Sequence, residues 1–150
     1  MTKFPFYHQH DTMQCGITCL RMICKYYGKE FSIEILSKYC FVTNEGVSLL
    51  GICDAASQLG LQNTCGRISM EQLYKAPLPC ILHWNQNHYV VLYRVKKTRF
   101  YIADPGKGLI KYSQEEFEKH WISTSSQGIE KGIVMFLQPT DTFLKKRMIL

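Results

Sequence analysis

The sequence predicts an α+β domain in which an N-terminal helical half packs on a C-terminal antiparallel sheet. In the first half, apolar residues recur at the three- and four-residue steps of amphipathic helices. The second half holds short runs rich in β-branched and aromatic residues, separated by polar or Gly/Pro turns. Short connections between successive runs indicate antiparallel pairing, because parallel strands need a longer crossover.

Helices are expected throughout the first half. The first lies in "CGITCLRMICKYYG", whose final glycine suits a helix C-terminus. The second follows Ser32, which can cap it, and the third ends at Gly60. A further short helix in "SMEQLYKA" has a capping box formed by Ser69 and Gln72.

The second half contains the expected strands, with a helix between the last two. The strands are "PCILHW", "HYVVLYRV", "RFYIAD", "GLIKYS" and "GIVMFLQP". The helix is "SQEEFEKHW", where Ser113 and Glu116 form a second capping box.

Length and composition favour one soluble, unexported domain. The chain has 150 residues, 46% of them hydrophobic and 20% charged. It shows neither a signal peptide nor an apolar run long enough to span a bilayer. We expect the domain to occupy residues 1–138, and residues 139–150 to form a basic tail, ending "LKKRMIL", that links to a transmembrane domain.

The net charge of +6 does not point to nucleic acid, because the basic residues are scattered along the chain. The seven cysteines are odd in number, and several fall at helix-core spacing. They are therefore expected to be reduced thiols, most of which pack as small hydrophobic side chains.

Cys15 differs from the other cysteines because it stands where a loop becomes the first helix. A helix N-terminus with a nearby histidine favours a reactive thiolate. Gly16, next to it, is expected to leave room for a substrate backbone. Cys19 and Cys24 lie inside the helix and are expected to pack.

A general base for Cys15 is best supplied by His88. The expected environment of His8, His10 and His120 is solvated surface, and His83 is expected to be packed or half exposed. His88 opens the most apolar strand, "HYVVLY", so its ring can stand at the sheet edge and face a cleft.

Asp104 is the expected partner of His88. The segments "HYVVLYRV" and "RFYIAD" form a hairpin through "KKT", which returns the end of the second strand beside the start of the first. Pro105 favours extended geometry at Asp104. For the oxyanion, the Cys15 backbone N–H is one expected donor and a glutamine is the other; spacing alone allows Gln9 or Gln14.

Four blocks of this sequence resemble the cysteine peptidase domain of family C39, found at the N-terminus of bacterial peptidase-containing ABC transporters. They are "QHDTMQCGITCLRMICKYYG", "EGVSLLGICDAASQLGL", "PCILHWNQNHYVVLY" and "YIADPGKG". The resemblance covers nearly the whole chain and implies a papain-like fold. It also implies that Cys15 is the nucleophile, His88 the general base, Asp104 its orienting partner and Gln9 the oxyanion-hole glutamine.

The chain departs from the family pattern at Gln14, where aspartate is usual. That position holds none of the reacting groups, so we expect activity to be retained. The replacement is expected to alter local hydrogen bonding or substrate preference.

The resemblance further implies removal of a leader peptide after a Gly-Gly pair in bacteriocin or pheromone precursors, coupled to export. The partners would be the precursor and the transmembrane and ATP-binding domains of a transporter, at the cytoplasmic side of the bacterial inner membrane. No cofactor is implied, since ATP would bind only a separate domain. The leader, an amphipathic helix, would lie in an apolar groove, for which residues 41–50 are candidates.

Other functions stay open at this point. The domain is alternatively a leader-binding module with little or no hydrolysis, or another papain-like thiol enzyme such as an acyl or γ-glutamyl transferase. A metal site made by Cys15, Cys19 and a histidine has the weakest support, because C-x-x-x-C within one helix is not the usual zinc spacing.

Overall fold

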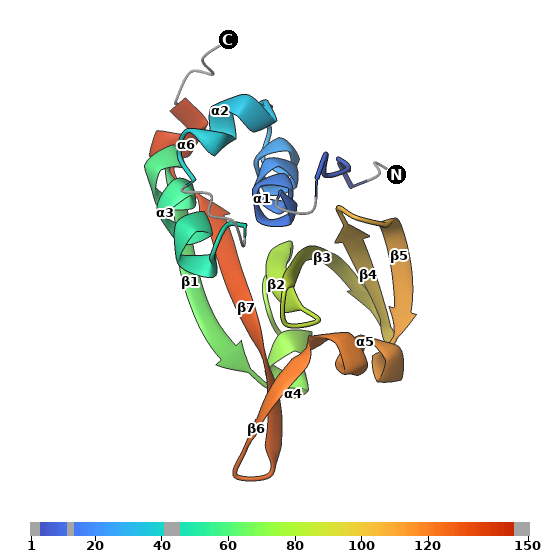
Figure 1. Ribbon diagram of the computed structural model, residues 1–150. Helices are drawn as coiled ribbons and strands as arrows, with labels where there is room; N and C mark the ends of the chain where they lie inside the picture. The colour runs from blue at the N-terminus through green and yellow to red at the C-terminus, as the bar shows by residue number, and fades with distance from the viewer. Residues whose placement is uncertain (1–3, 12–13, 41–45, 146–150) are drawn as a thin grey trace.

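The computed structural model describes residues 4–11, 14–40 and 46–145 of the chain. Figure 1 shows helices on both sides of a central sheet. The helices are α1 (Cys15–Tyr26), α2 (Ile33–Ser37), α3 (Leu49–Leu59), α4 (Met70–Tyr74), α5 (Gln114–Trp121) and α6 (Asp141–Lys145). The strands are β1 (Leu61–Ile68), β2 (Cys80–Trp84), β3 (His88–Lys96), β4 (Arg99–Asp104), β5 (Gly108–Ser113), β6 (Ile122–Ser126) and β7 (Ile129–Pro139).

The strands form one seven-stranded antiparallel sheet in the order β1-β7-β2-β3-β4-β5, with β6 paired to β7. The α+β prediction is confirmed, as are the antiparallel pairings along the second half. The expectation that the first half is helical was wrong for Leu61–Ile68, which pairs with β7 along its whole length. The hairpin of β6 and β7 turns through Gln127 and Gly128, both with positive φ.

Apolar residues cover both faces of the sheet, so the domain has two cores. α1, α2, α3 and α6 enclose the first core together with inward-facing strand residues such as Val91 and Met135. On the opposite face, Phe117 and Trp121 of α5 pack against Trp84 and Phe100. α1, α2, α3 and α6 therefore cover one face of the sheet, and α4 and α5 pack on the other, where Leu73 of α4 joins the second core.

Serine side chains begin four of the helices. The hydroxyls of Ser32, Ser48, Ser69 and Ser113 each accept a hydrogen bond from a backbone N–H in the first turn of α2, α3, α4 and α5. The capping box of Ser69 and Gln72 is present as expected. α1 is different, because its N-cap residue Gln14 makes no side-chain cap.

The packed domain continues beyond residue 138. The Thr140 backbone N–H donates to the Gly60 carbonyl, and Phe143 of α6 is buried in the first core. Residues 146–150 of the expected basic linker lie outside the described part of the chain. Among the described residues, the structure contains no helix with the length and apolar character needed to cross a membrane.

Candidate active site

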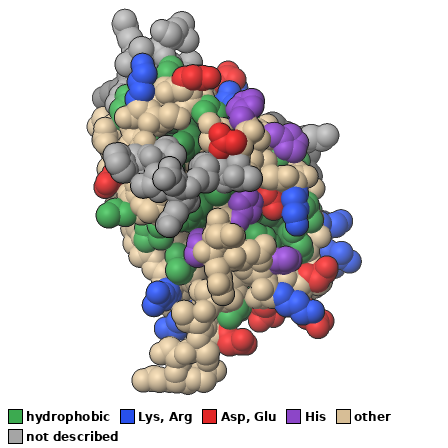
Figure 2. Space-filling view, viewed as in Figure 1, with side chains coloured by type: hydrophobic (Ala, Val, Ile, Leu, Met, Phe, Trp, Pro, Cys, Tyr) green, Lys and Arg blue, Asp and Glu red, His purple; other side chains and the backbone are tan. Residues whose placement is uncertain are grey.

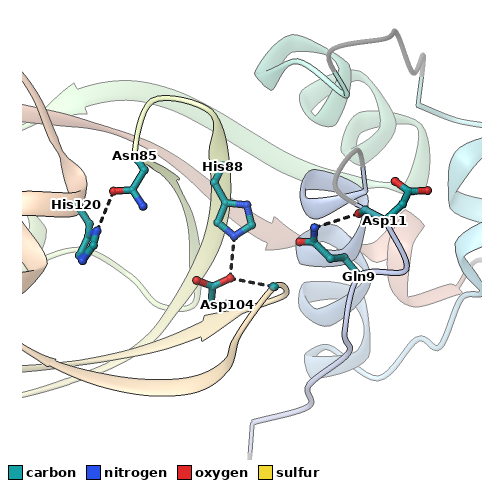
Figure 3. Close-up of polar contacts among 7 residues, drawn as sticks. Gln9, Asp11, Asn85, His88, Asp104 and His120 are labelled. Atoms are coloured by element: carbon teal, nitrogen blue, oxygen red, sulfur yellow. Dashed lines mark hydrogen bonds and ion pairs between the residues drawn. The ribbon is translucent and has the colours of Figure 1, made fainter.

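The β3–β4 hairpin brings His88 and Asp104 together. His88 is the first residue of β3 and Asp104 the last of β4, and a short turn joins the two strands. The His88 Nε2 to Asp104 Oδ1 distance is 2.7 Å (Figure 3). The predicted juxtaposition is confirmed, even though a bulge between Leu92 and Arg94 shifts the strand register on the way.

Asp104 is a buried, ionised carboxylate. Its side chain is 2% exposed, and its Oδ1 accepts a second hydrogen bond from the Gly106 backbone N–H at 2.9 Å. Burial alone raises the pKa of a carboxyl group, but the bonds from His88 and Gly106 outweigh burial and lower the pKa of Asp104 below its ordinary value. The carboxylate therefore fixes one ring nitrogen of His88 at neutral pH.

Cys15 approaches the same histidine from the opposite side, at the first position of α1. The thiol is 7% exposed and hydrogen-bonds the His88 ring. Burial lowers the pKa of His88, but the Asp104 and Cys15 contacts more than compensate and raise it from 6.5 to about 9. Since Nε2 binds Asp104, Nδ1 is the ring nitrogen left for Cys15. The ring therefore lies between the thiol and the carboxylate, as in a cysteine–histidine–acid triad.

Gln14, the N-cap residue of α1, does not cap the helix with its side chain. The Gln14 side chain turns away from the helix, and its Oε1 accepts a hydrogen bond from the His10 backbone N–H. Uncapped amides at a helix N-terminus favour a negative charge at that end. Cys15 stands at this end of the helix, and whether aspartate at position 14 would change the hydrogen bonding stays a prediction.

Gly16 serves helix packing. A Cβ on Gly16 would lie 2.7 Å from Cδ1 of Ile52 in α3 and 3.5 Å from the Tyr89 ring. The space that was expected to admit a substrate backbone is filled by these two side chains. The close approach of α3 thus sets the position of the Cys15 turn.

Gln9 lies beside the Asp104 carboxylate on the N-terminal segment. Its backbone N–H donates to the Pro105 carbonyl at 2.9 Å, and its Nε2 donates to the Asp11 carbonyl at 3.0 Å (Figure 3). A Cβ on Gly106 would lie 3.6 Å from Gln9 Oε1 and 3.5 Å from Asp104 Oδ1. Gln9 therefore shares the site with the hairpin, whereas the Gln14 side chain bonds the His10 backbone.

The cysteines inside α1 differ from Cys15 in their surroundings. Burial, with the nearby Cys15 and Asp104, raises the pKa of the Cys19 thiol well above its usual value, and burial raises that of Cys24 to about 12. Protonated thiols are poor metal ligands. Among the described residues, no group of three or more His, Cys, Asp and Glu is arranged to hold a metal ion, which does not favour the alternative with Cys15 and Cys19 as ligands.

The remaining histidines lie in different settings. His8 and His10 are exposed, as expected, and His83 is half-buried with a pKa lowered by burial. The expectation of a solvated surface was wrong for His120. Its ring stacks on Trp84 and its Nδ1 lies 2.8 Å from Asn85 Oδ1 (Figure 3), which ties α5 to the turn before His88.

A cavity of about 390 Å³ lies between the start of α3 and the β2–β3 turn. It is lined by Gly46, Val47, Ser48, His83, Gln86, Asn87 and Tyr89. Tyr89 also lies 3.5 Å from the position that a Cβ on Gly16 would take, so it extends from the cavity to the start of α1. Burial and the neighbouring Cys15 raise the pKa of Tyr89 to about 12. The sequence analysis did not single out Tyr89. Its position directly after His88 is the feature of the sequence that could have indicated it.

The surface proposed for the leader is described only in part. Residues 41–45 of the expected groove lie outside the described residues. Of those that follow, Val47 is buried, Leu49 half-buried and Leu50 70% exposed. Leu50 follows the cavity-lining residues Val47 and Ser48 in sequence, and a single exposed leucine does not by itself mark a contact surface.

Comparison with known proteins gives the same family in sequence and in structure. The Peptidase C39 family model matches residues 3–126. The chain is 35% identical over 119 residues to the colicin V secretion/processing ATP-binding protein CvaB of Escherichia coli, covering 79% of this chain and 17% of that protein. It is 34% identical over 138 residues to the lactococcin-G-processing and transport ATP-binding protein LagD of Lactococcus lactis subsp. lactis, covering 88% and 18%.

The structure resembles two solved peptidases over most of their length. With the double glycine motif protease of an AMS/PCAT transporter, solved in complex with the leader peptide, the TM-score is 0.81 at 35% identity, covering 92% of this chain and 93% of that one. With the peptidase domain of Streptococcus ComA, the TM-score is 0.79 at 25% identity, covering 92% and 100%. The chain spans less than a fifth of the length of the two curated relatives. It belongs to the peptidase C39 family.

Proposed function

We propose that this domain is a cysteine endopeptidase that cleaves leader peptides after a Gly-Gly pair. The observation that carries the proposal is the position of His88, which contacts the Cys15 thiol on one side and the buried Asp104 carboxylate on the other. This is the arrangement that a thiol peptidase requires: a nucleophile, a base beside it and an acceptor that orients the base.

In the proposed reaction the Cys15 thiolate attacks the carbonyl carbon of the second glycine. The protonated His88 then gives its proton to the leaving amine, which becomes the new N-terminus of the mature peptide. Next, His88 takes a proton from water, and the hydroxide releases the leader as a free acid from the thioester. Asp104 keeps its charge throughout and holds the His88 ring in place.

Gln9 is the proposed side-chain donor to the oxyanion. A primary amide carries two N–H donors, and the bond to the Asp11 carbonyl uses one of them and orients the group. The second N–H of Gln9, with the backbone N–H of Cys15, would stabilise the negative charge on the attacked carbonyl oxygen.

Leader recognition is proposed at the start of α3. The cavity beside Tyr89 adjoins the Cys15 turn, and the exposed Leu50 lies close to it in sequence. A related double glycine motif protease was solved with its leader peptide bound, which supports a peptide substrate for this fold. An amphipathic leader would place its apolar side chains on this surface.

We further propose that the domain works within an exporter of bacteriocins or peptide pheromones. The relatives are processing and transport ATP-binding proteins several times longer than this chain, which supports transmembrane and ATP-binding domains as partners. In that setting the peptidase would face the cytoplasm at the bacterial inner membrane. Figure 2 shows Lys and Arg side chains interspersed with Asp and Glu on the face viewed, so we propose no nucleic-acid partner.

The test is cleavage of a precursor peptide that carries a Gly-Gly leader, followed by mass spectrometry. We expect the wild-type chain to give one leader and one mature peptide, and Cys15→Ala to give neither. The matched control is a precursor whose second glycine is valine, which should resist cleavage. We propose no cofactor, so cleavage should survive a chelator and stop with a thiol alkylating reagent. Intact precursor with folded wild-type protein would contradict the peptidase proposal.

The same assay separates the alternatives. A leader-binding module would retain the peptide without forming product, which binding by calorimetry would show. An acyltransferase would place an added amine on the leader carboxyl group in preference to water. Our expectation is the free leader acid as the main product even with a primary amine present.

A further inference from the structure

Two cysteines outside the active site lie close enough to react with each other. Cys53 is on α3 and Cys65 is on β1, and their Sγ atoms are 2.9 Å apart. Both are free thiols in the structure. A disulfide has an S–S distance of about 2.05 Å, so bond formation requires a small further approach of the two sulfur atoms.

The fold holds this pair by local contacts. α3 leads directly into β1 through Gly60, and the strand folds back along the helix. The Asn63 side chain donates to the Cys53 carbonyl at 3.3 Å and to the Ser57 hydroxyl at 2.9 Å. Residues two apart in a strand share a face, so Asn63 and Cys65 both face α3.

Solvent access distinguishes this pair from the other cysteines. Cys65 is exposed and Cys53 is half-buried, whereas the remaining five are buried. An oxidant in solution therefore meets Cys65 first, with Cys53 in contact behind it. A resolving thiol beside an accessible one is the arrangement found at redox-active cysteines.

We propose that Cys53 and Cys65 are a redox-active pair that forms a reversible disulfide with a small-molecule disulfide, such as oxidised glutathione, as oxidant. The Cys65 thiolate attacks one sulfur of the oxidant, which releases one molecule of reduced thiol and leaves a mixed disulfide. Cys53 then attacks the Cys65 sulfur and releases the second reduced thiol. The two protein thiols lose two electrons and two protons, and the oxidant gains both.

The second step requires the Cys53 thiolate, so its rate depends on pH. Burial, followed by the hydrogen bond and charge of Cys65 and the charge of Asp54, raises the pKa of the Cys53 thiol to about 12. Only a small fraction is then thiolate at pH 7, and this fraction rises about tenfold for each pH unit. Closure of the disulfide should accelerate with pH in the same proportion.

The disulfide would link a helix of the active-site wall to an edge strand. Ile52, next to Cys53, packs on Gly16 beside Cys15. A bond between α3 and β1 therefore restrains the helix that supports the Cys15 turn. The bond closes a short loop in the chain, which raises the thermal midpoint by on the order of 5–10 °C.

The experiment uses the full chain with Cys15→Ser, so that chemistry at the active site does not interfere. It is incubated with oxidised glutathione, free thiols are alkylated, and the intact mass is read. We expect two alkyl groups fewer than in the untreated protein, no glutathione adduct, and reversal by a dithiol reductant. Cleavage on the N-terminal side of Asp54 separates the two cysteines, so the disulfide appears as a link between residues 11–53 and 54–103. Fragmentation of the linked peptides then assigns the bond, because these segments also hold Cys19, Cys24, Cys40 and Cys80.

Adding Cys53→Ser gives the matched control, which should hold a stable glutathione adduct on Cys65. Adding Cys65→Ser instead changes an exposed position and should give neither adduct nor disulfide. An adduct that persists equally with and without Cys53 would overturn the proposal. A link between any other two cysteines would also overturn it. Both readouts are independent of peptidase activity.

Discussion

The two sides of the active site are held in different ways. His88 and Asp104 stand at neighbouring ends of one hairpin, and a 2.7 Å polar contact joins them. Cys15 is held by the helical half, where α1 lies in the first core and Ile52 packs against Gly16. The sheet side thus depends on short polar contacts, and the helical side on apolar packing. Substitutions of the polar pair His88 and Asp104 should lower activity with little loss of stability, and substitutions of packing residues in the helical half should do the reverse.

The largest effect is expected from His88→Gln. The substitution removes both the proton donor to the leaving amine and the partner of the Cys15 thiolate. We expect kcat on a Gly-Gly precursor to fall by about 10³-fold, while the thermal midpoint stays close to that of the wild type, because the 22% exposed side chain tolerates an amide. His8→Gln, the same change at an exposed histidine, should alter kcat less than twofold. Retention of a tenth of the activity in His88→Gln would exclude His88 as the general base.

Asp104→Asn should lower activity less and should also change its pH dependence. Asp104 contributes to raising the pKa of His88 to about 9, so His88 remains protonated below that pH and loses its proton above it. Activity that needs the imidazolium should therefore decline above about pH 9 in the wild type. Without the carboxylate the His88 pKa falls toward 6.5, and the alkaline limb moves to lower pH.

The measurement for Asp104→Asn is kcat/KM between pH 5 and 10. We expect a loss of about 10–100-fold at pH 8 and a smaller loss at pH 6. An unchanged alkaline limb with reduced activity would mean that Asp104 orients the His88 ring without raising the pKa of His88.

Gly60→Ala tests the packing that holds the helical side of the active site. Gly60 ends α3 with φ of 93°, and a Cβ there would lie 2.6 Å from the Phe143 backbone nitrogen. We expect the free energy of unfolding to fall by about 2–3 kcal/mol, measured by urea titration, with near-normal kcat in the protein that remains folded. Gly66→Ala is the control, since a Cβ at Gly66 meets nothing within 4 Å. Equal stabilities of the two variants would contradict this packing.

The smallest effect is expected from Gln14→Asp, which installs the residue usual in the family. A carboxylate beside the uncapped start of α1 should raise the free energy of unfolding by about 0.3–1 kcal/mol. The helix N-terminus lowers the pKa of the introduced carboxyl group. The added stability is therefore present above about pH 4 and is lost as the pH falls through this lowered pKa. Gln14→Asn, which has no charge, should show no such pH dependence in thermal unfolding.

Local pattern was enough to predict the sheet side of the site. The strands on either side of "KKT" have clear apolar character, and hairpin return alone places Asp104 near His88. The approach of Cys15 to this hairpin depends on packing between residues far apart in sequence, such as Gly16 against Ile52 and Tyr89. Spacing holds no information on that contact, and only the family resemblance indicated it.

The elements that the sequence analysis missed lie at the sheet margin. β1 has mostly exposed side chains and β6 is "ISTSS", so neither carries the apolar alternation that marks a half-buried strand. Both become strands because the long β7 offers them backbone partners. Tertiary pairing of this kind overrides weak local preference.

The turn of the β6–β7 hairpin is a suitable place to insert a label or an affinity tag. Gln127 and Gly128 are exposed, and the hairpin projects away from α1 and from the β3–β4 hairpin (Figure 1). A cysteine-independent label or an affinity tag inserted there would not obstruct the active site and would not react with the cysteine thiols. The domain could then be immobilised on a sensor surface in one orientation, with the side that carries Cys15 and His88 toward the solution.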